Sequence, residues 1–103
     1  MPNANSYVKF SEIAISDLVN YLRLPETTQA DETLLGTILE AAKSFVLTYT
    51  GRDETSADLF PEFTIAVYAI AEELFDKRTF TVDTNTANEI IASILGSRSI
   101  NLL

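Results

Sequence analysis

The side chains best suited to acid–base chemistry in this sequence are its carboxylates, and the closest of them are neighbours in the chain. Glu72 is followed by Glu73, and Asp53 by Glu54. Adjacent residues on a helix point about 100° apart, so neither pair is expected to form one site. A catalytic carboxylate also needs a shaped pocket that shifts its pKa. We therefore interpret these pairs as solvated acidic surface.

A metal-binding loop is the alternative interpretation for one acidic segment. Asp53, Glu54 and Asp58 are close enough in the sequence to hold a divalent cation. The segment lacks the regular ligand alternation and the turn glycine of a calcium-binding loop. We expect no metal and no other cofactor.

Hydroxyl nucleophiles are plentiful, but the sequence offers no activating base for them. The chain has no histidine and no cysteine, which removes the usual general base, the commonest metal ligand and thiolate chemistry. Lys9, Lys43 and Lys77 stand in no Ser–Lys motif, and a hydroxyl without a base is a weak nucleophile. The three glycines form no phosphate-binding loop. The sequence predicts a protein without catalytic activity.

The composition indicates one small folded unit with an acidic surface. The chain has 103 residues, of which 47% are hydrophobic, and a net charge of −8. This is the size of a single domain, with enough apolar material for a core. The negative charge disfavours general binding to nucleic-acid phosphates, which needs clustered Lys and Arg. No apolar run approaches the roughly 20 residues of a membrane helix, so we expect an intracellular protein without membrane contact.

Hydrophobic spacing predicts an all-α fold, a small bundle of about four helices with a short first helix, two longer central helices and a C-terminal helix. One domain is expected over residues 1–103, with a mobile start at residues 1–6. The first helix should begin with Ser16 as its N-cap and run to about Arg23, before Pro25 stops it.

The second helix has the strongest pattern, and we expect it over residues 32–50. Asp31 is placed to cap its first turn, and Gly51 lies just past its end, where a left-handed residue is favoured. Residues 52–59 are expected to form a polar, acidic loop. The apolar residues of the helix recur every three or four positions along one face: Leu35, Ile38, Leu39, Ala42, Phe45, Val46 and Tyr49.

The third helix is expected to be apolar on two sides. Pro61 suits its first turn, where the missing N–H has no partner to lose. A second patch, away from the main stripe, consists of Ile65, Tyr68 and Phe75. Because a helix with two apolar sides is usually buried on both, this patch predicts contact with another helix or another subunit. The main stripe consists of Phe63, Ala66, Val67, Ile70 and Leu74.

A fourth helix is expected after a loop at residues 79–85. Thr86 and Glu89 have the spacing of a capping box, in which each side chain accepts a hydrogen bond from the other residue's backbone N–H. Gly96 should end this helix. Its buried face is expected to consist of Ile90, Ile91, Ile94 and Leu95.

More apolar side chains are present than one small domain is expected to hide. Each of them could fold back onto the core, but together they predict a surface for a partner. The surplus consists of Tyr68, Phe75, Phe80 and Val82, with Ile100, Leu102 and Leu103 in an apolar tail at residues 97–103.

Three stretches of the chain follow the order and spacing of a known family. They are residues 17–24 (Asp-Leu-Val-Asn-Tyr-Leu-Arg-Leu), residues 30–52, which close with Tyr49-Thr50-Gly51-Arg52, and residues 59–78, which open with Leu59-Phe60-Pro61-Glu62 and close with Phe75-Asp76-Lys77-Arg78. In these stretches the chain resembles the head–tail connector (adaptor) family of tailed bacteriophages, which includes connectors of lambdoid phages and related prophage DNA-packaging proteins. Phe75 stands where the family often has Tyr, and the last part of the chain matches least well.

The resemblance implies a structural function without chemistry. Members of this family form a ring, dodecameric in the virion, beneath the portal protein at the capsid vertex. The ring extends the DNA channel, binds no specific DNA sequence, and provides the docking surface for the next tail-completion or stopper protein. The implied location is the head–tail junction of the virion, and the host cytoplasm during assembly. A closed ring of heterologous contacts needs two different complementary faces on each subunit.

Eight residues are the candidates for a subunit or partner interface: Ile65, Tyr68, Phe75, Arg52, Arg78, Phe80, Ile100 and Leu102. Arg52 and Arg78 have an alternative role, because positive charges near helix C-termini complement the helix dipole. Two other functions stay open. One is a small acidic regulatory or adaptor module that binds another protein through the same apolar patch. The other is a helix-turn-helix regulator, whose recognition helix should present basic and amide residues to DNA.

Overall fold

The computed structural model describes residues 7–78 and 84–95 of the chain, and all regular secondary structure in these residues is helical. The expected all-α fold is therefore confirmed, with a short first helix, two longer central helices and a C-terminal helix. One further helical turn, α3, lies in the segment that was expected to be a loop. In chain order the elements are the 3-10 turn η1 (Phe10–Glu12), α1 (Ile15–Leu22), α2 (Gln29–Thr50), α3 (Glu54–Ala57), α4 (Pro61–Lys77) and α5 (Thr84–Ile94).

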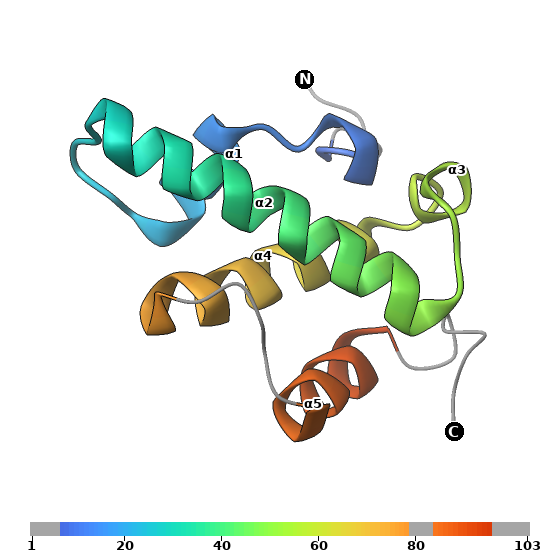
Figure 1. Ribbon diagram of the computed structural model, residues 1–103. Coiled ribbons are helices and arrows are strands. Elements are labelled where there is room, and N and C mark those ends of the chain that lie inside the picture. Colours follow the sequence, from blue (N-terminus) through green and yellow to red (C-terminus); the bar gives the residue numbers. More distant parts are fainter. Residues whose placement is uncertain (1–6, 79–83, 96–103) are drawn as a thin grey trace.

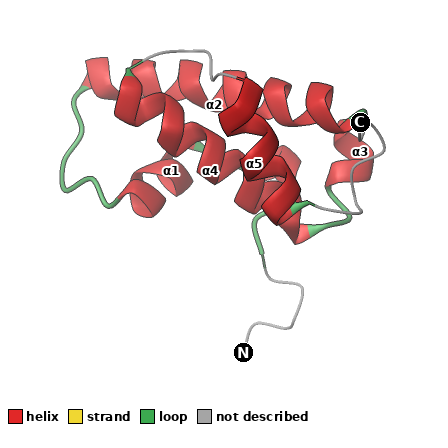
Figure 2. Ribbon diagram, turned by 90° about the horizontal axis from the view of Figure 1, so that it is seen from below, coloured by secondary structure: helices red, strands yellow, loops and turns green. Residues whose placement is uncertain are grey.

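Helix α4 lies at the centre of the arrangement. It packs along α2 and also contacts α1, α5 and η1 (Figures 1 and 2). Burying one large aliphatic or aromatic side chain contributes about 1.5–3 kcal/mol, so this shared core holds the helices together. The predicted main stripe of α4 is buried throughout. It joins one core with Phe10, Ile13, Leu18, Ile38, Leu39, Ala42, Val46, Ala57 and Leu95.

Residues 7–13, which we call the N-terminal strap, are tied to the segment that follows α2. The backbone N–H of Ser11 donates to Asp58 Oδ1 at 2.8 Å, and its hydroxyl donates to Asp58 Oδ2 at 2.7 Å. The hydroxyl of Thr64 on α4 donates to the carbonyl oxygen of Val8 at 2.6 Å. These bonds hold the strap, which precedes α1 in the chain, against the core.

Helix α2 begins three residues before the predicted start, and Thr28 is its N-cap. The hydroxyl of Thr28 accepts from the Asp31 N–H at 3.2 Å, and the Asp31 carboxylate accepts from the Thr28 N–H at 3.0 Å. That backbone hydrogen bond holds the pKa of Asp31 below its ordinary value of 3.8. The prediction that Asp31 itself caps the helix is wrong, because this reciprocal pair stabilises one more turn.

Helix α1 also begins earlier than predicted, because Ala14 is its N-cap in place of Ser16. The carboxylate of Asp17, in the first turn, accepts from the Ala14 N–H at 2.8 Å. An acidic side chain there satisfies a free backbone donor and complements the helix dipole.

Helix α5 begins at Thr84, so Thr86 lies inside its first turn and the predicted start of the helix at Thr86 is wrong. Residues 79–83, the greater part of the expected loop, lie outside the described residues. The apolar side of α5 is as expected where it is described, since Leu95 is buried and Ile90 and Ile94 pack partly buried against the core.

Glycine, proline and arginine stand at the helix ends. Gly51 ends α2 in the left-handed region at φ 74°, and Pro61 opens α4 at its first turn, as predicted. Arg23 and Arg78 end α1 and α4 in the same left-handed region, at φ 60° and φ 51°. This conformation costs a non-glycine residue about 1–2 kcal/mol. Gly96, expected to end α5, lies outside the described residues.

Candidate interaction surface

An aromatic stack joins α1 to α4 on a solvent-exposed side of the bundle. The rings of Tyr21 and Tyr68 have centroids 4.9 Å apart and planes inclined by 27°. Tyr21 is 42% exposed, and Ile65, one turn before Tyr68, is 52% exposed. Glu72, one turn after Tyr68, accepts a long hydrogen bond of 3.5 Å from the Tyr21 hydroxyl. We call these four residues the tyrosine face.

The spacing of the chain brings these side chains together. Ile65, Tyr68 and Glu72 are three and four residues apart, so they lie along one stripe of α4. Tyr21 is three residues after Leu18, which is fully buried and anchors α1. Because α1 packs against α4, the Tyr21 ring stacks on Tyr68, while Tyr21 as a whole remains 42% exposed.

Burial and nearby carboxylates together raise the pKa values of both phenols in the tyrosine face. Desolvation is the main cause that raises the pKa of the Tyr21 phenol, and the charge and hydrogen bond of Glu72 raise it further. Desolvation also raises the pKa of Tyr68, with a further contribution from the negative charge of Asp17. Both rings are therefore neutral at physiological pH and stack in a negative potential.

Cations of the described residues cover other aromatic rings. Within residues 7–78 and 84–95, no cation lies over either ring of the tyrosine face. A positive group over an aromatic ring is attracted by the negative potential of the ring face. Three such pairs, 4.2–5.8 Å from cation to ring centroid, lie elsewhere in the fold: Arg78 over Phe75, Arg52 over Phe60 and Lys43 over Phe10.

Two of the eight predicted interface residues, Ile65 and Tyr68, lie together in the tyrosine face. Phe75 is on the same side of α4, two turns after Tyr68, and is partly buried beside Arg78. Arg52 is bound within its own chain, over an aromatic ring near the end of α2. The other three predicted residues lie outside the described part of the chain: Phe80, Ile100 and Leu102.

Two exposed residues were not selected from the sequence. Tyr21 shares the helical spacing of Leu18 and Leu22, which indicated a buried side and gave no sign that Tyr21 is 42% exposed. Leu59 is 70% exposed directly after α3. Its signal was present, because it is a large apolar residue in a segment that is otherwise polar and acidic.

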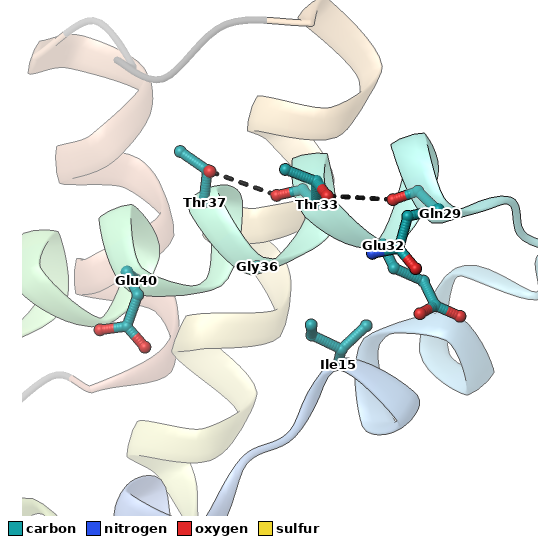
Figure 3. Close-up of a pocket in the computed structure, with 7 residues that line it drawn as sticks. All are labelled: Ile15, Gln29, Glu32, Thr33, Gly36, Thr37 and Glu40. Atoms are coloured by element: carbon teal, nitrogen blue, oxygen red, sulfur yellow. Dashed lines mark hydrogen bonds between the residues drawn. The ribbon is translucent and has the colours of Figure 1, made fainter.

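A shallow hollow of about 560 Å³ lies along α2, on the side where α1 begins (Figure 3). Gly36 is among its lining residues, and a Cβ there would lie in ordinary van der Waals contact with Ile15 Cδ1, at 3.4 Å. The hydroxyls of Thr33 and Thr37 donate to carbonyl oxygens of the same helix at 3.0 and 3.2 Å. We assign the hollow no chemistry. Its lining residues are Ile15, Gln29, Glu32, Thr33, Gly36, Thr37 and Glu40.

The acidic segment around α3 has structural roles. Asp53 is the N-cap of α3 and accepts from the Ser56 N–H at 2.8 Å. Asp58 accepts two hydrogen bonds from Ser11 in the N-terminal strap. In the part of the chain that the structure describes, no group of three or more acidic residues is arranged to hold a metal ion.

No described helix combines the length and the apolar character needed to cross a membrane. Comparison with known proteins gives no match: no protein-family model, no curated protein and no solved structure corresponds to this chain.

Proposed function

We propose that this chain is a non-catalytic subunit of a homo-oligomeric ring, a head–tail connector that joins a phage portal to the tail and extends the DNA channel. The observation that carries the proposal is the tyrosine face, where Tyr21 and Ile65 are 42% and 52% exposed. Clustered exposed apolar residues mark interaction surfaces. An aromatic centre beside charged groups is also the usual anatomy of a protein–protein interface.

A second exposed apolar side chain lies elsewhere on the molecule. Leu59 follows α3, which lies at the end of α2 opposite to its connection with α1 (Figure 1). A closed ring needs two different surfaces on each subunit, one for each neighbour. The tyrosine face and the surface around Leu59 supply two candidates for this pair of contacts.

The order of the helices supports the same function. The three stretches that resemble the connector family coincide with α1, with α2 up to its glycine end, and with α4 from its proline start. The acidic chain, with a net charge of −8, suits a subunit beside a channel through which DNA passes without being held.

The test is the mass of the protein in solution across a concentration series, with electron micrographs of any large species. Wild-type protein is expected to form ring-sized assemblies. Ile65→Asp is expected to shift the mass toward monomer without lowering the free energy of unfolding by more than about 0.5 kcal/mol, because the residue is exposed. Ser44→Asp, at an exposed position of α2, is the matched control and is expected to assemble normally.

The alternative is a small acidic adaptor module that uses the same tyrosine face to bind a different protein. A chain that stays monomeric or dimeric at every concentration, and is not retained by a phage portal protein in a pull-down, contradicts the connector and favours the adaptor. A DNA-binding regulator requires a strongly salt-dependent shift of duplex DNA.

A further inference from the structure

The tyrosine face differs from the stack of Phe60 and Phe63 because no cation of the described residues lies over it. The stack of Phe60 on Phe63 has the guanidinium of Arg52 over the Phe60 ring, 5.5 Å from its centroid. The stack of Tyr21 on Tyr68 has no cation over it within the described residues, although the carboxylates of Glu72 and Asp17 lie near it. A tyrosine ring beside carboxylates attracts a positive group, because the ring face and the carboxylates are both negative.

The exposed part of Tyr21 offers the surface for such a group. Tyr68 covers one side of the ring at 4.9 Å, and the remaining 42% of Tyr21 faces solvent. The Glu72 carboxylate is 3.5 Å from the Tyr21 hydroxyl, at the edge of the same ring. A planar guanidinium stacked on the ring would therefore reach an acceptor with its N–H groups. Arginine suits both contacts better than lysine, because its flat group stacks and donates at the same time.

Two further residues favour the same occupant. Asp17 lies close enough to Tyr68 to influence its ionisation, so a second negative charge acts on the stack. Ile65, 52% exposed, offers apolar surface to the methylene chain and to the neighbours of an incoming arginine.

We infer that the tyrosine face binds an arginine side chain of a partner protein, stacked on Tyr21 and paired with Glu72. The inference rests on the proposed function to the extent that the neighbouring protein in an assembly would supply the arginine. It names the chemistry of the contact and leaves the number of subunits open.

The test uses the full-length protein and two small probes, N-acetyl-arginine amide and N-acetyl-citrulline amide, which share a shape and differ in charge. The ring proton signals of Tyr21 and Tyr68 are followed by NMR during titration. Arginine amide is expected to shift both sets saturably and to bind about tenfold more tightly than citrulline amide. Added salt should weaken this binding, because exposed charges are screened.

Three variants locate the contact. Glu72→Gln keeps the shape and removes the charge, and it is expected to weaken arginine amide binding about fivefold. Tyr21→Leu removes the ring and should abolish the difference between the two probes. Glu73→Gln is the matched control, since Glu73 is paired with Lys77 at 2.8 Å and points about 100° away from Glu72. It is expected to bind as the wild type does.

Equal binding of the two probes, or equal losses in Glu72→Gln and Glu73→Gln, would overturn the inference. The mass of wild type and Glu72→Gln, measured in parallel, separates it from the proposed function. Arginine amide binding without any assembly would contradict the proposed oligomeric ring and support the arginine site. If subunit rings still assemble in Glu72→Gln and no arginine amide binds, the arginine site is contradicted and the oligomeric ring is supported.

Discussion

Two aromatic stacks involve α4. Both consist of two stacked rings, but only one of them has a cation over it in the described residues. Phe60 and Phe63 stack at 6.1 Å, with Phe63 fully buried and Arg52 over the outer ring. Tyr21 and Tyr68 stack at 4.9 Å, with carboxylates beside them and 42% of Tyr21 in solvent. The first stack is completed by its own chain and serves the fold. The second stack offers an aromatic surface that a partner can complete.

The largest expected difference between the stacks is in stability. Phe63→Ala is expected to lower the free energy of unfolding by about 3–5 kcal/mol, because it leaves a cavity at a fully buried position. Tyr21→Ala should cost about 1 kcal/mol, the value of an aromatic pair with one exposed partner. Urea denaturation followed by circular dichroism measures both. Similar losses in the two variants would show that the tyrosine stack is also part of the core.

The next difference concerns the charged neighbours. Arg52→Gln removes the cation over Phe60 and the hydrogen bond from Arg52 to the Ser56 hydroxyl, and should cost about 1 kcal/mol. Glu72→Gln removes a carboxylate that only a long hydrogen bond ties to the fold, and should change stability by less than about 0.5 kcal/mol. The same denaturation experiment compares them, and a larger loss for Glu72→Gln contradicts the comparison.

A cation can be added to the open stack from within the chain. Ile65→Arg places a guanidinium three residues before Tyr68, and should raise the free energy of unfolding by about 0.2–0.5 kcal/mol. It should also weaken the binding of N-acetyl-arginine amide, because the added side chain occupies the same surface. Ile65→Gln, of similar length and without charge, is the control. Unchanged binding of N-acetyl-arginine amide to Ile65→Arg would show that the probe binds outside the tyrosine face.

The smallest expected effect is the response to alkaline pH. The folded chain raises the pKa of Tyr21 and Tyr68 above 10.0, so folding favours the neutral phenols. Their contribution to stability is fully present below pH 10.0 and is lost as the pH rises through the folded values. Tyr21→Phe should flatten this alkaline decline in the free energy of unfolding, whereas Phe63→Leu should leave its slope unchanged. A decline as steep in Tyr21→Phe as in the wild type would exclude Tyr21 as its source.

The helical architecture could be predicted because several local signals agree. Gly51 and Pro61 mark backbone positions that few other residues suit, and both were assigned correctly from the sequence. The stripe from Phe63 to Leu74 identifies a buried side of α4, since apolar residues three and four apart share one side of a helix. These features depend on residues a few positions apart.

The helix starts were less predictable, because polar residues before an apolar stripe offer several equivalent caps. Thr28 and Asp31 are both good N-cap residues, and their reciprocal hydrogen bonds place the N-cap of α2 at Thr28. The tyrosine face depended on a contact across the fold. Ile65 and Tyr68 were predicted from their spacing on α4, whereas Glu72 was interpreted as solvated surface. Tyr21 joins them only because α1 packs against α4 at that point.

The N-terminal strap is synthesised before the residues that hold it in place. Ser11 and Val8 bond to Asp58 and Thr64, which follow them in the chain by 47 and 56 residues. At ribosomal rates of about 5–20 residues per second, the strap waits on the order of 2–11 s for these partners. Phe10, which ends 1% exposed, lacks its final cover during that time. The speed of translation between residues 8 and 64 therefore sets how long this aromatic residue is available to chaperones or to other nascent chains.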